Sequence, residues 1–513
     1  MRTICLKNLC YRAIRLVAQP QGNRNWIPPL SVRRHTAYNL VGQILPILLS
    51  LVTVPLYLKL VGSERYGVLA IAWLLLGYFG LFDLGLGRAT SFRLAAQKDA
   101  EPQARADTMW AALAVNALMG VAGGLVLWAA AEFFFGRIFK VSPELRPEVV
   151  AAVPLLAFAV PVATVTGVLT GAMQGRERFL EINTVNVIST TLFQLIPLGI
   201  ALVAGPNLPL LLLGALTARG LAAAVLAYRC HVELTRGLPA RLDRKEIVLL
   251  LKYGGWVNLT SIFGPVLYML DRFTIGAMLS ARAVTDYTVP YQLANRTAIM
   301  SGSLVGALFP RLSSATADER EVLADRATMT ILALLSPLFL AGIYIMQPFL
   351  HFWVGQKVGP DAPFVGRFIL MAMWANALAL VPFTRLQASG RPDLVSKILL
   401  AEIPPYLLML WAGIHFFGLI GSAAAASLRW LMDYALLTWV AGRRFTGFGL
   451  IFGNFVVLCA AIYCAGIWSF TEPLWWASAT GLGAISLALA FRALPSEIRQ
   501  RLEGVLKRGS AFS

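Results

Sequence analysis

The stretch from Val149 to Met173, VVAAVPLLAFAVPVATVTGVLTGAM, contains no charged residue. As an α-helix it is long enough to cross the hydrocarbon core of a bilayer, which is about 30 Å thick. Inside hydrocarbon every backbone amide must be paired, so only helices and closed barrels span a membrane. The stretch lacks the alternating pattern of a barrel strand. It therefore predicts a membrane-spanning helix.

Hydrophobic stretches of this kind recur along the rest of the chain. Hydrophobic residues make up 58% and charged residues 14% of the 513 residues, and the mean hydropathy is +0.68. We predict an all-α polytopic membrane protein with about fourteen spanning helices. The predicted spans are residues 37–60, 66–87, 107–135, 149–173, 179–204, 208–229, 247–278, 284–309, 327–350, 363–386, 394–415, 418–441, 449–469 and 473–492.

The basic residues are distributed unevenly between the loops. The formal net charge is +18, from 44 Lys and Arg residues against 26 Asp and Glu residues. With an even number of helices, most of the 44 fall on one side of the membrane, in the two tails and in alternate loops. Because Lys and Arg gather on the cytoplasmic side, this pattern predicts a multi-pass protein of the bacterial inner membrane with both termini in the cytoplasm. The same rule explains the positive charge without a nucleic-acid partner.

A weak internal repeat appears when the second half of the chain is displaced by about 220 residues. The aligned pairs are Asn39 with Asn258, Pro46 with Pro265, Tyr66 with Tyr287 and Arg219 with Arg429. Six helices per half predict two lobes related by a pseudo-two-fold axis along the membrane normal. The predicted parts are a basic tail at 1–36, the first lobe at 37–229, a cytoplasmic linker at 230–246, the second lobe at 247–441, two additional helices at 442–492 and a tail at 493–513.

The five cysteines are scattered along the chain. Cys5 and Cys10 lie in the basic tail, Cys230 lies at the end of a predicted span, and Cys459 and Cys464 lie in an apolar stretch. None has a histidine nearby at metal-ligand spacing. The sequence therefore predicts neither a disulfide framework nor a metal site.

Several motifs resemble those of a known family. The segments 39–42 (NLVG), 60–67 (LVGSERYG) and 78–86 (YFGLFDLGL) resemble the opening of Wzx-type polysaccharide flippases. The segment 174–179 (QGRERF) is similar to the cytoplasmic turn between their fourth and fifth helices. This family belongs to the multidrug/oligosaccharidyl-lipid/polysaccharide exporter superfamily. The resemblance extends over nearly the whole spanning region, from about residue 36 to residue 445.

The resemblance implies a function. A Wzx-type flippase moves a polyprenyl-pyrophosphate-linked oligosaccharide across the inner membrane by alternating access, for the synthesis of lipopolysaccharide, including O-antigen, or of exopolysaccharide. The implied partners are this lipid-linked oligosaccharide, membrane lipid and other polysaccharide-assembly proteins. No cofactor is expected apart from a coupling ion, which is either a proton or Na⁺.

An anionic pyrophosphate needs cationic donors inside an otherwise apolar bundle. The segment from Lys252 to Asn258 is too polar to face lipid, and Arg296 lies in the polar run at 292–297. The predicted substrate-binding residues are Lys252, Asn258, Arg272, Asn295 and Arg296. Snorkelling to an interface is the alternative for Lys252 and Arg272, and Arg272 also has Asp271 beside it.

Five further positions have predicted roles in coupling, structure or motion. Glu402 is the most central acid and is followed by a proline pair, so it is the candidate for binding a coupling ion, with a structural contact between helices as the alternative. Asp433 follows Arg429 by four residues, a spacing that predicts a structural ion pair. Pro46 and Pro265 are predicted hinges, with static kinks as the alternative.

Two other functions compete with the flippase. A cation-coupled multidrug antiporter of the same superfamily is expected to line its cavity with acids, whereas the second half carries Lys252, Arg272 and Arg296. A membrane polysaccharide polymerase or ligase needs a folded site outside the bilayer, but the predicted outer loops are short and contain no nucleotide motif. A passive scaffold would have no use for buried cations. The sequence thus favours a flippase that is not an enzyme.

Overall fold

The computed structural model describes residues 30–78, 85–244, 246–250, 263–306, 308–442, 447–494 and 499–500, without the side chains of 30–44, 263–266 and 317. Most of these residues are helical and none of them lies in a β-strand. The prediction of an all-α fold is therefore confirmed. The chain divides into two compact units, residues 1–44 and residues 45–513, and the contacts described below belong to the second unit.

The helices follow one another with short connections. In the first half they are α2 (Leu30–Leu60), α3 (Ser63–Tyr78), α4 (Leu86–Ala96), α5 (Pro102–Phe133), α6 (Arg146–Gly175), α7 (Phe179–Val203) and α8 (Leu208–Cys230). In the second half they are α10 (Phe263–Met278), α11 (Ala281–Asn295), α12 (Ala298–Gly306), α13 (Phe309–Ser314), α14 (Ala317–Trp353), α15 (Ala362–Ala388), α16 (Pro392–Val440), α17 (Phe448–Ile467) and α18 (Pro473–Ala493).

Nine helices within the described residues are long and apolar enough to cross a membrane. They comprise α5 to α8 and α14 to α18, and residues 45–60 of α2 form a shorter apolar segment. The chain is thus a multi-pass membrane protein. The total of about fourteen spans stays a prediction, since much of the predicted seventh span lies outside the described residues.

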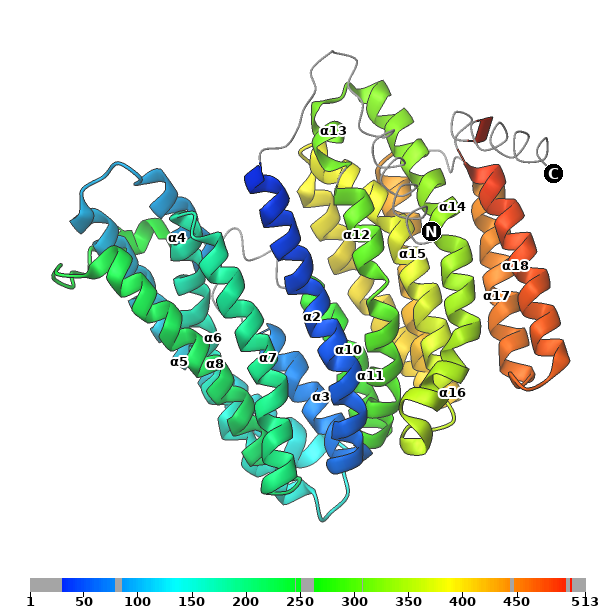
Figure 1. Cartoon of the computed structure of the whole chain (residues 1–513), viewed down its shortest axis with the longest axis horizontal. Coiled ribbons are helices and arrows are strands. Elements are labelled where there is room, and N and C mark those ends of the chain that lie inside the picture. Colours follow the sequence, from blue (N-terminus) through cyan, green and yellow to red (C-terminus); the bar gives the residue numbers. More distant parts are fainter. Residues whose placement is uncertain are drawn as a thin grey trace. The chain divides into compact units, whose positions relative to one another are not determined.

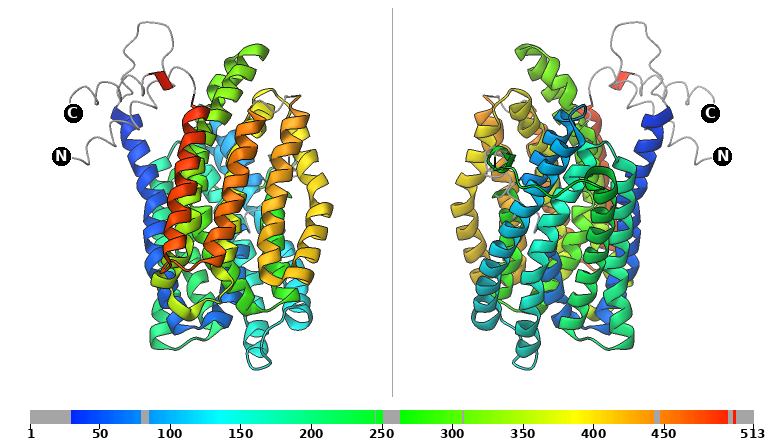
Figure 2. Two further views of the ribbon diagram at one scale, coloured as in Figure 1. Left: turned by 90° about the vertical axis from the view of Figure 1, so that its right-hand side faces the viewer. Right: turned by 90° about the vertical axis from the view of Figure 1, so that its left-hand side faces the viewer.

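The helices of the second unit form two groups (Figure 1). Helices α4 to α8 pack against one another, and so do α10 to α16. Helix α3 contacts α6 and α8 of the first group and α10 and α11 of the second. The junction between the groups is therefore built around α3 and α11. Helices α17 and α18 run side by side against α14 (Figure 2). Tyr344 of α14 donates a hydrogen bond of 3.0 Å to Ser478 of α18.

The predicted span at 284–309 is broken in the structure. Helix α11 ends at Asn295 and α12 begins at Ala298. At the break, the amides of Arg296 and Thr297 bond to carbonyl oxygens three residues earlier, at 3.2 and 3.1 Å, instead of four residues earlier. A tightened turn inside a spanning helix is tolerated where it is covered by protein or lines a cavity. The break places Arg296 between two helices rather than within one.

A second interruption lies where the predictions at 394–415 and 418–441 meet. Helix α16 covers both spans and is divided at Gly418, whose φ is 57°. Glycine adopts this left-handed conformation without steric cost. Beyond the turn the two parts approach so closely that a β-carbon on Gly413 would press against the backbone of Gly421. The predicted pair of helices is therefore present, joined by a one-residue turn.

The two groups interlock through a set of loops that we call the clasp, comprising residues 61–67, 139–142 and 276–285. The amide of Lys140 donates to the carbonyl oxygen of Gly276, and the amide of Ala281 donates to that of Lys140, both at 2.9 Å. The hydroxyl of Thr285 donates to the Ser63 carbonyl oxygen at 2.5 Å. Because most of these groups belong to the main chain, these hydrogen bonds depend little on side-chain identity.

Gly67 allows the closest approach in the clasp, and we expect Gly67→Ala to lower the stability of the protein. A β-carbon at this position would collide with the carbonyl oxygen of Ala281, so α3 and α11 would have to separate, at a cost of about 1–3 kcal/mol in the free energy of unfolding. Thermal unfolding in detergent measures this loss. The matched control is Gly77→Ala in the same helix, where a β-carbon meets nothing within 4 Å and should be neutral or stabilising. Equal melting temperatures for the two variants would contradict the prediction.

Candidate functional site

Some of the predicted site residues fall where the structure gives no side-chain description. Lys252 and Asn258 lie outside the described residues, and Pro265 lies in α10 at a position whose side chain is not described. Pro46 lies within α2 and is half-buried. The roles of these four residues as substrate contacts and hinges stay predictions.

Arg272 lies in the interior of the second helix group, on α10, and is 3% exposed. Its Nη1 donates to Asp271 Oδ1 at 3.0 Å and to the Tyr268 carbonyl oxygen at 2.8 Å. The Tyr287 hydroxyl of α11 donates to the other carboxylate oxygen of Asp271 at 2.6 Å. The guanidinium also lies 3.9 Å from the centre of the Tyr291 ring. Arg272 is therefore paired with the adjacent Asp271 in a buried position rather than at an interface, and its role as a substrate contact stays a prediction.

A second buried arginine lies on α16. Arg429 is 3% exposed, and its Nη1 lies 3.5 Å from Glu402 Oε2, a residue that is 0% exposed. The guanidinium also lies over the rings of Trp430, at 4.2 Å, and Tyr406, at 5.3 Å. The ion-pair partner of Arg429 is thus Glu402 from the first part of α16. Glu402 is a partner that the predicted pair with Asp433 did not include, and it reaches Arg429 because the turn at Gly418 brings the two parts of the helix together.

Asp433 completes this group, which we call the α16 cluster: Glu402, Arg429 and Asp433. Its carboxyl is 5% exposed and lies near enough to interact electrostatically with both other members. Neither oxygen of Glu402 has a well-formed hydrogen bond with a described residue. Two buried carboxyl groups therefore share one guanidinium, and the cluster carries an excess negative charge unless it takes up a cation. Among the described residues, no three His, Cys, Asp or Glu side chains form a group that could hold a metal ion.

Arg296 has a different environment. It lies at the break between α11 and α12, is half-buried, and its Nη2 is 3.4 Å from the Ser50 hydroxyl of α2. It forms no ion pair with any carboxylate of the described residues. Asn295 beside it is exposed. Arg296 thus presents an uncompensated positive charge at the side of α2.

Arg219, which the internal repeat aligns with Arg429, also lacks a carboxylate partner among the described residues. Arg219 lies midway along α8, and its guanidinium is 5.0 Å from the centre of the Phe193 ring of α7. Its side chain is accessible yet enclosed on several sides by protein, and no described carboxylate pairs with it. Its aligned counterpart Arg429 has a carboxylate partner, whereas Arg219 has none among the described residues. The internal repeat alone therefore could not show which of the two arginines is paired.

Helix α2 connects the surroundings of the two unpaired arginines. Its Ser50 contacts Arg296, and its Thr53, one turn further on, donates to the side-chain oxygen of Gln194 at 3.0 Å. Gln194 is the chain neighbour of Phe193, over which Arg219 lies. The surroundings of Arg219 and Arg296 therefore contact the same short section of α2, at positions one turn apart on one face of the helix.

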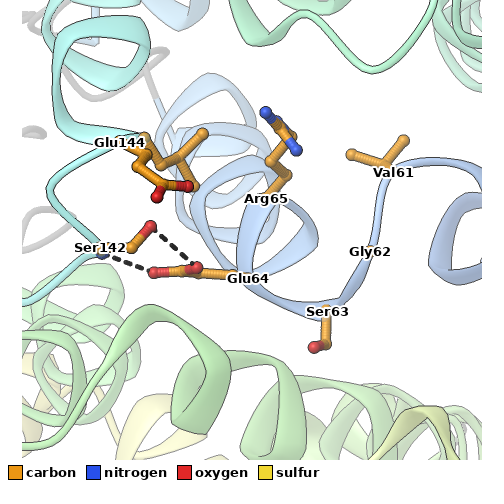
Figure 3. A pocket seen from close by; sticks show the side chains of 8 residues that line it. Val61, Gly62, Ser63, Glu64, Arg65, Ser142 and Glu144 are labelled. Atoms are coloured by element: carbon orange, nitrogen blue, oxygen red, sulfur yellow. Dashed lines mark hydrogen bonds between the residues drawn. The ribbon is translucent and has the colours of Figure 1, made fainter.

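A surface pocket lies elsewhere, beside the loops of the clasp. It has a volume of about 270 Å³ and is lined by residues 61–65, 142, 144 and 145. Figure 3 shows that Glu64 points toward Ser142, whose amide and hydroxyl donate to its two carboxylate oxygens at 2.7 and 3.1 Å. Its charged lining residues are Glu64, Arg65 and Glu144, and Arg65 is already paired with Glu148, so the remaining acidic charge makes the pocket unsuitable for an anionic substrate. We assign this pocket to the clasp rather than to a binding site.

Comparison with known sequences identifies related proteins. The model of a family described as "Polysaccharide biosynthesis protein" matches residues 32–316. A proposed O-antigen transporter of Shigella flexneri is 26% identical over 416 residues, which cover 81% of this chain and 98% of that protein.

Comparison with solved structures identifies the fold. The lipid II flippase MurJ, in an inward closed conformation, has a TM-score of 0.67 at 13% identity, covering 89% of this chain and 98% of its own. A multidrug resistance MATE family transporter of the MOP superfamily, in an inward-facing conformation, has a TM-score of 0.65 at 14% identity. The match covers 79% of this chain and 97% of that transporter. All of these relatives are described as transporters, flippases or polysaccharide biosynthesis proteins. The prediction that the chain is not an enzyme is confirmed.

Proposed function

Since this chain belongs to the family of polysaccharide biosynthesis proteins and has the fold of membrane transporters, we propose that it carries a polyprenyl-pyrophosphate-linked oligosaccharide across the bacterial inner membrane by alternating access. In this proposal both termini lie in the cytoplasm, and the sugar is delivered to polysaccharide-assembly proteins on the other side. The lipid tail stays in the bilayer while the pyrophosphate and the sugar pass between the two helix groups.

The observation that carries this proposal is the pair of arginines without carboxylate partners. Arg219 and Arg296 come from different helix groups, and their surroundings contact α2 at positions one turn apart on one face. A guanidinium matches the geometry of a phosphate and is costly to hold unpaired within a membrane. A pyrophosphate bound between them would supply the missing negative charge. A multidrug antiporter for organic cations, the alternative from the sequence, would gain nothing from these charges.

The clasp supports the alternating-access part of the proposal. It joins the loops that the charge distribution assigns to the periplasmic side, so the substrate would enter from the cytoplasmic side in this conformation. Release would require the clasp to open. The broken helix at Arg296 lies beside this route, as interrupted helices do in many transporters.

We further propose that the α16 cluster couples transport to a proton. One guanidinium cannot neutralise both Glu402 and Asp433, and a single proton would remove the excess charge. Na⁺, the other ion considered from the sequence, is disfavoured because the guanidinium of Arg429 already lies 3.5 Å from Glu402 and would repel it. The proton would be taken up and released as the cluster opens to the two sides in turn.

The proposed function is tested with the full-length protein in liposomes. A fluorescent undecaprenyl-pyrophosphate oligosaccharide is placed in both leaflets, and an impermeant quencher added outside reports how much of the lipid reaches the outer leaflet. We expect the whole pool to become accessible with the protein and only the outer half without it. If the same fraction of the lipid is accessible with and without the protein, and the protein exports organic cations, the flippase is contradicted and the drug antiporter is favoured.

A further inference from the structure

Aromatic side chains continue from Arg219 toward the junction of the two helix groups. The Phe193 ring centre lies 6.0 Å from that of Trp73 in α3. Trp73 in turn lies 5.1 Å from Tyr57 and 5.9 Å from Tyr66, with its ring plane nearly perpendicular to both. The guanidinium and the aromatic rings therefore form one continuous lining.

The lining has a fixed base and an accessible face. Tyr57 and Tyr66 are 1% and 0% exposed, and the Tyr57 hydroxyl donates to the carbonyl oxygen of Gln194 at 2.6 Å. Trp73 and Phe193 are only partly buried, and Arg219 is exposed. The two tyrosines thus hold Trp73 in place, while the rings of Trp73 and Phe193 and the charge of Arg219 remain available to a ligand.

Trp73 also has an unused hydrogen-bond donor. Its Nε1–H is enclosed by protein but meets no acceptor among the described residues. A buried indole N–H normally has a partner, because leaving it unpaired is unfavourable. The aromatic lining is therefore incomplete as a purely structural core, and an acceptor brought by a ligand would satisfy the N–H once the side chains that cover it move aside.

We propose that Trp73, Phe193 and Arg219 form a subsite for the sugar residue attached directly to the pyrophosphate. The inference rests on the proposed function and specifies which chemical group meets which side chain. The C–H face of a pyranose ring stacks on an aromatic ring, its hydroxyl groups accept from an indole N–H, and the adjoining phosphate pairs with a guanidinium. These three contacts need the residue types found here, side by side.

The corresponding position in the second half is closed. Arg429 also lies over aromatic rings, those of Trp430 and Tyr406, but Glu402 neutralises it and all three of the charged groups in its cluster are buried. Only the first-half arrangement leaves both the charge and the rings available. The subsite is therefore assigned to the first half alone.

The test compares two lipids that differ only in the sugar. Purified full-length protein is titrated with undecaprenyl pyrophosphate and with the same lipid carrying an oligosaccharide. We expect Trp73→Leu to weaken binding of the glycosylated lipid about tenfold and to leave binding of the bare lipid unchanged. Trp73→Phe, which keeps a ring but removes the N–H, should have an intermediate effect. Arg219→Gln should weaken binding of both lipids.

The controls separate the subsite from the proposed function. Trp439→Leu replaces an exposed tryptophan on α16 and should change neither affinity. If Trp73→Leu is poorly folded by thermal unfolding, Phe193→Leu is used in its place with the same expectation. Equal weakening of both lipids by the Trp73 variant, or no weakening of either, overturns the subsite while the flippase stands. Failure of the native protein to bind either lipid overturns both.

Discussion

Replacing Arg219 with glutamine is expected to reduce lipid-linked oligosaccharide transport by about one to two orders of magnitude. The substitution removes a charge-assisted contact with the pyrophosphate worth about 1.5–3 kcal/mol. No described carboxylate depends on Arg219 for neutralisation, so the fold should lose little stability. The effect therefore belongs to the substrate rather than to the protein core. Transport in liposomes and thermal unfolding are to be measured on the same preparations.

The matched control lies on the same helix. Arg229, at the end of α8, forms an ion pair of 2.7 Å with Glu181 and is largely solvated. Because exposed pairs contribute only about 0–1 kcal/mol, Arg229→Gln should leave transport nearly unchanged. Arg219→Lys should retain part of the activity, since a lysine keeps the charge without the planar guanidinium. Wild-type transport by Arg219→Gln would remove Arg219 from the substrate path.

Replacing Glu402 with glutamine is expected to abolish the acceleration of transport by a proton gradient. The amide fills the same volume but cannot exchange a proton, and Asp433 can then pair alone with Arg429. Coupling free energies of 1–3 kcal/mol correspond to a loss of gradient stimulation by about 5- to 150-fold. Transport without an imposed gradient should persist, because Glu402 does not touch the route proposed for the substrate.

Transport rates with and without an inside-to-outside pH difference provide the measurement. Arg429→Gln serves as the contrasting variant: it leaves two carboxyl groups buried together without a cation and should cost about 3–5 kcal/mol of stability. If Glu402→Gln lowers stability as much as Arg429→Gln does, the cluster is structural. If the proton gradient still accelerates transport by Glu402→Gln fully, the coupling proton is carried by another group.

The helices were largely predictable from sequence because hydrocarbon imposes a strict length and composition on each span. The predicted span at 179–204 and helix α7 at Phe179–Val203 nearly coincide. The break in the predicted span at 284–309 was not foreseen, because residues 291–299 around it contain neither proline nor glycine. The only signal was the polar run at 292–297, which suggested a cavity but not a change of helix.

The partners of the charged residues were less predictable. Helical spacing favoured Asp433 as the partner of Arg429, but spacing describes neighbours within one helix. The further partner, Glu402, comes from the opposite side of the turn at Gly418, a contact that exists only after the two parts of α16 fold together. Likewise, nothing in the local sequence around Arg219 indicates that it lacks a carboxylate. Absence of a partner is a property of the whole fold.

The construction of the clasp affects how the protein would tolerate a changing environment. Apart from the hydrogen bonds that Ser142 donates to the Glu64 carboxylate, its hydrogen bonds end on neutral carbonyl oxygens, including the one from Lys140 Nζ to Met278. Hydrogen bonds of this kind are little weakened by dissolved salt, in contrast to ion pairs between exposed side chains. If the clasp faces the periplasm, whose salt concentration follows that of the surroundings, the contacts that close the protein on that side would hold at low and at high salt. Leakage of small ions through an idle carrier would then not vary with habitat.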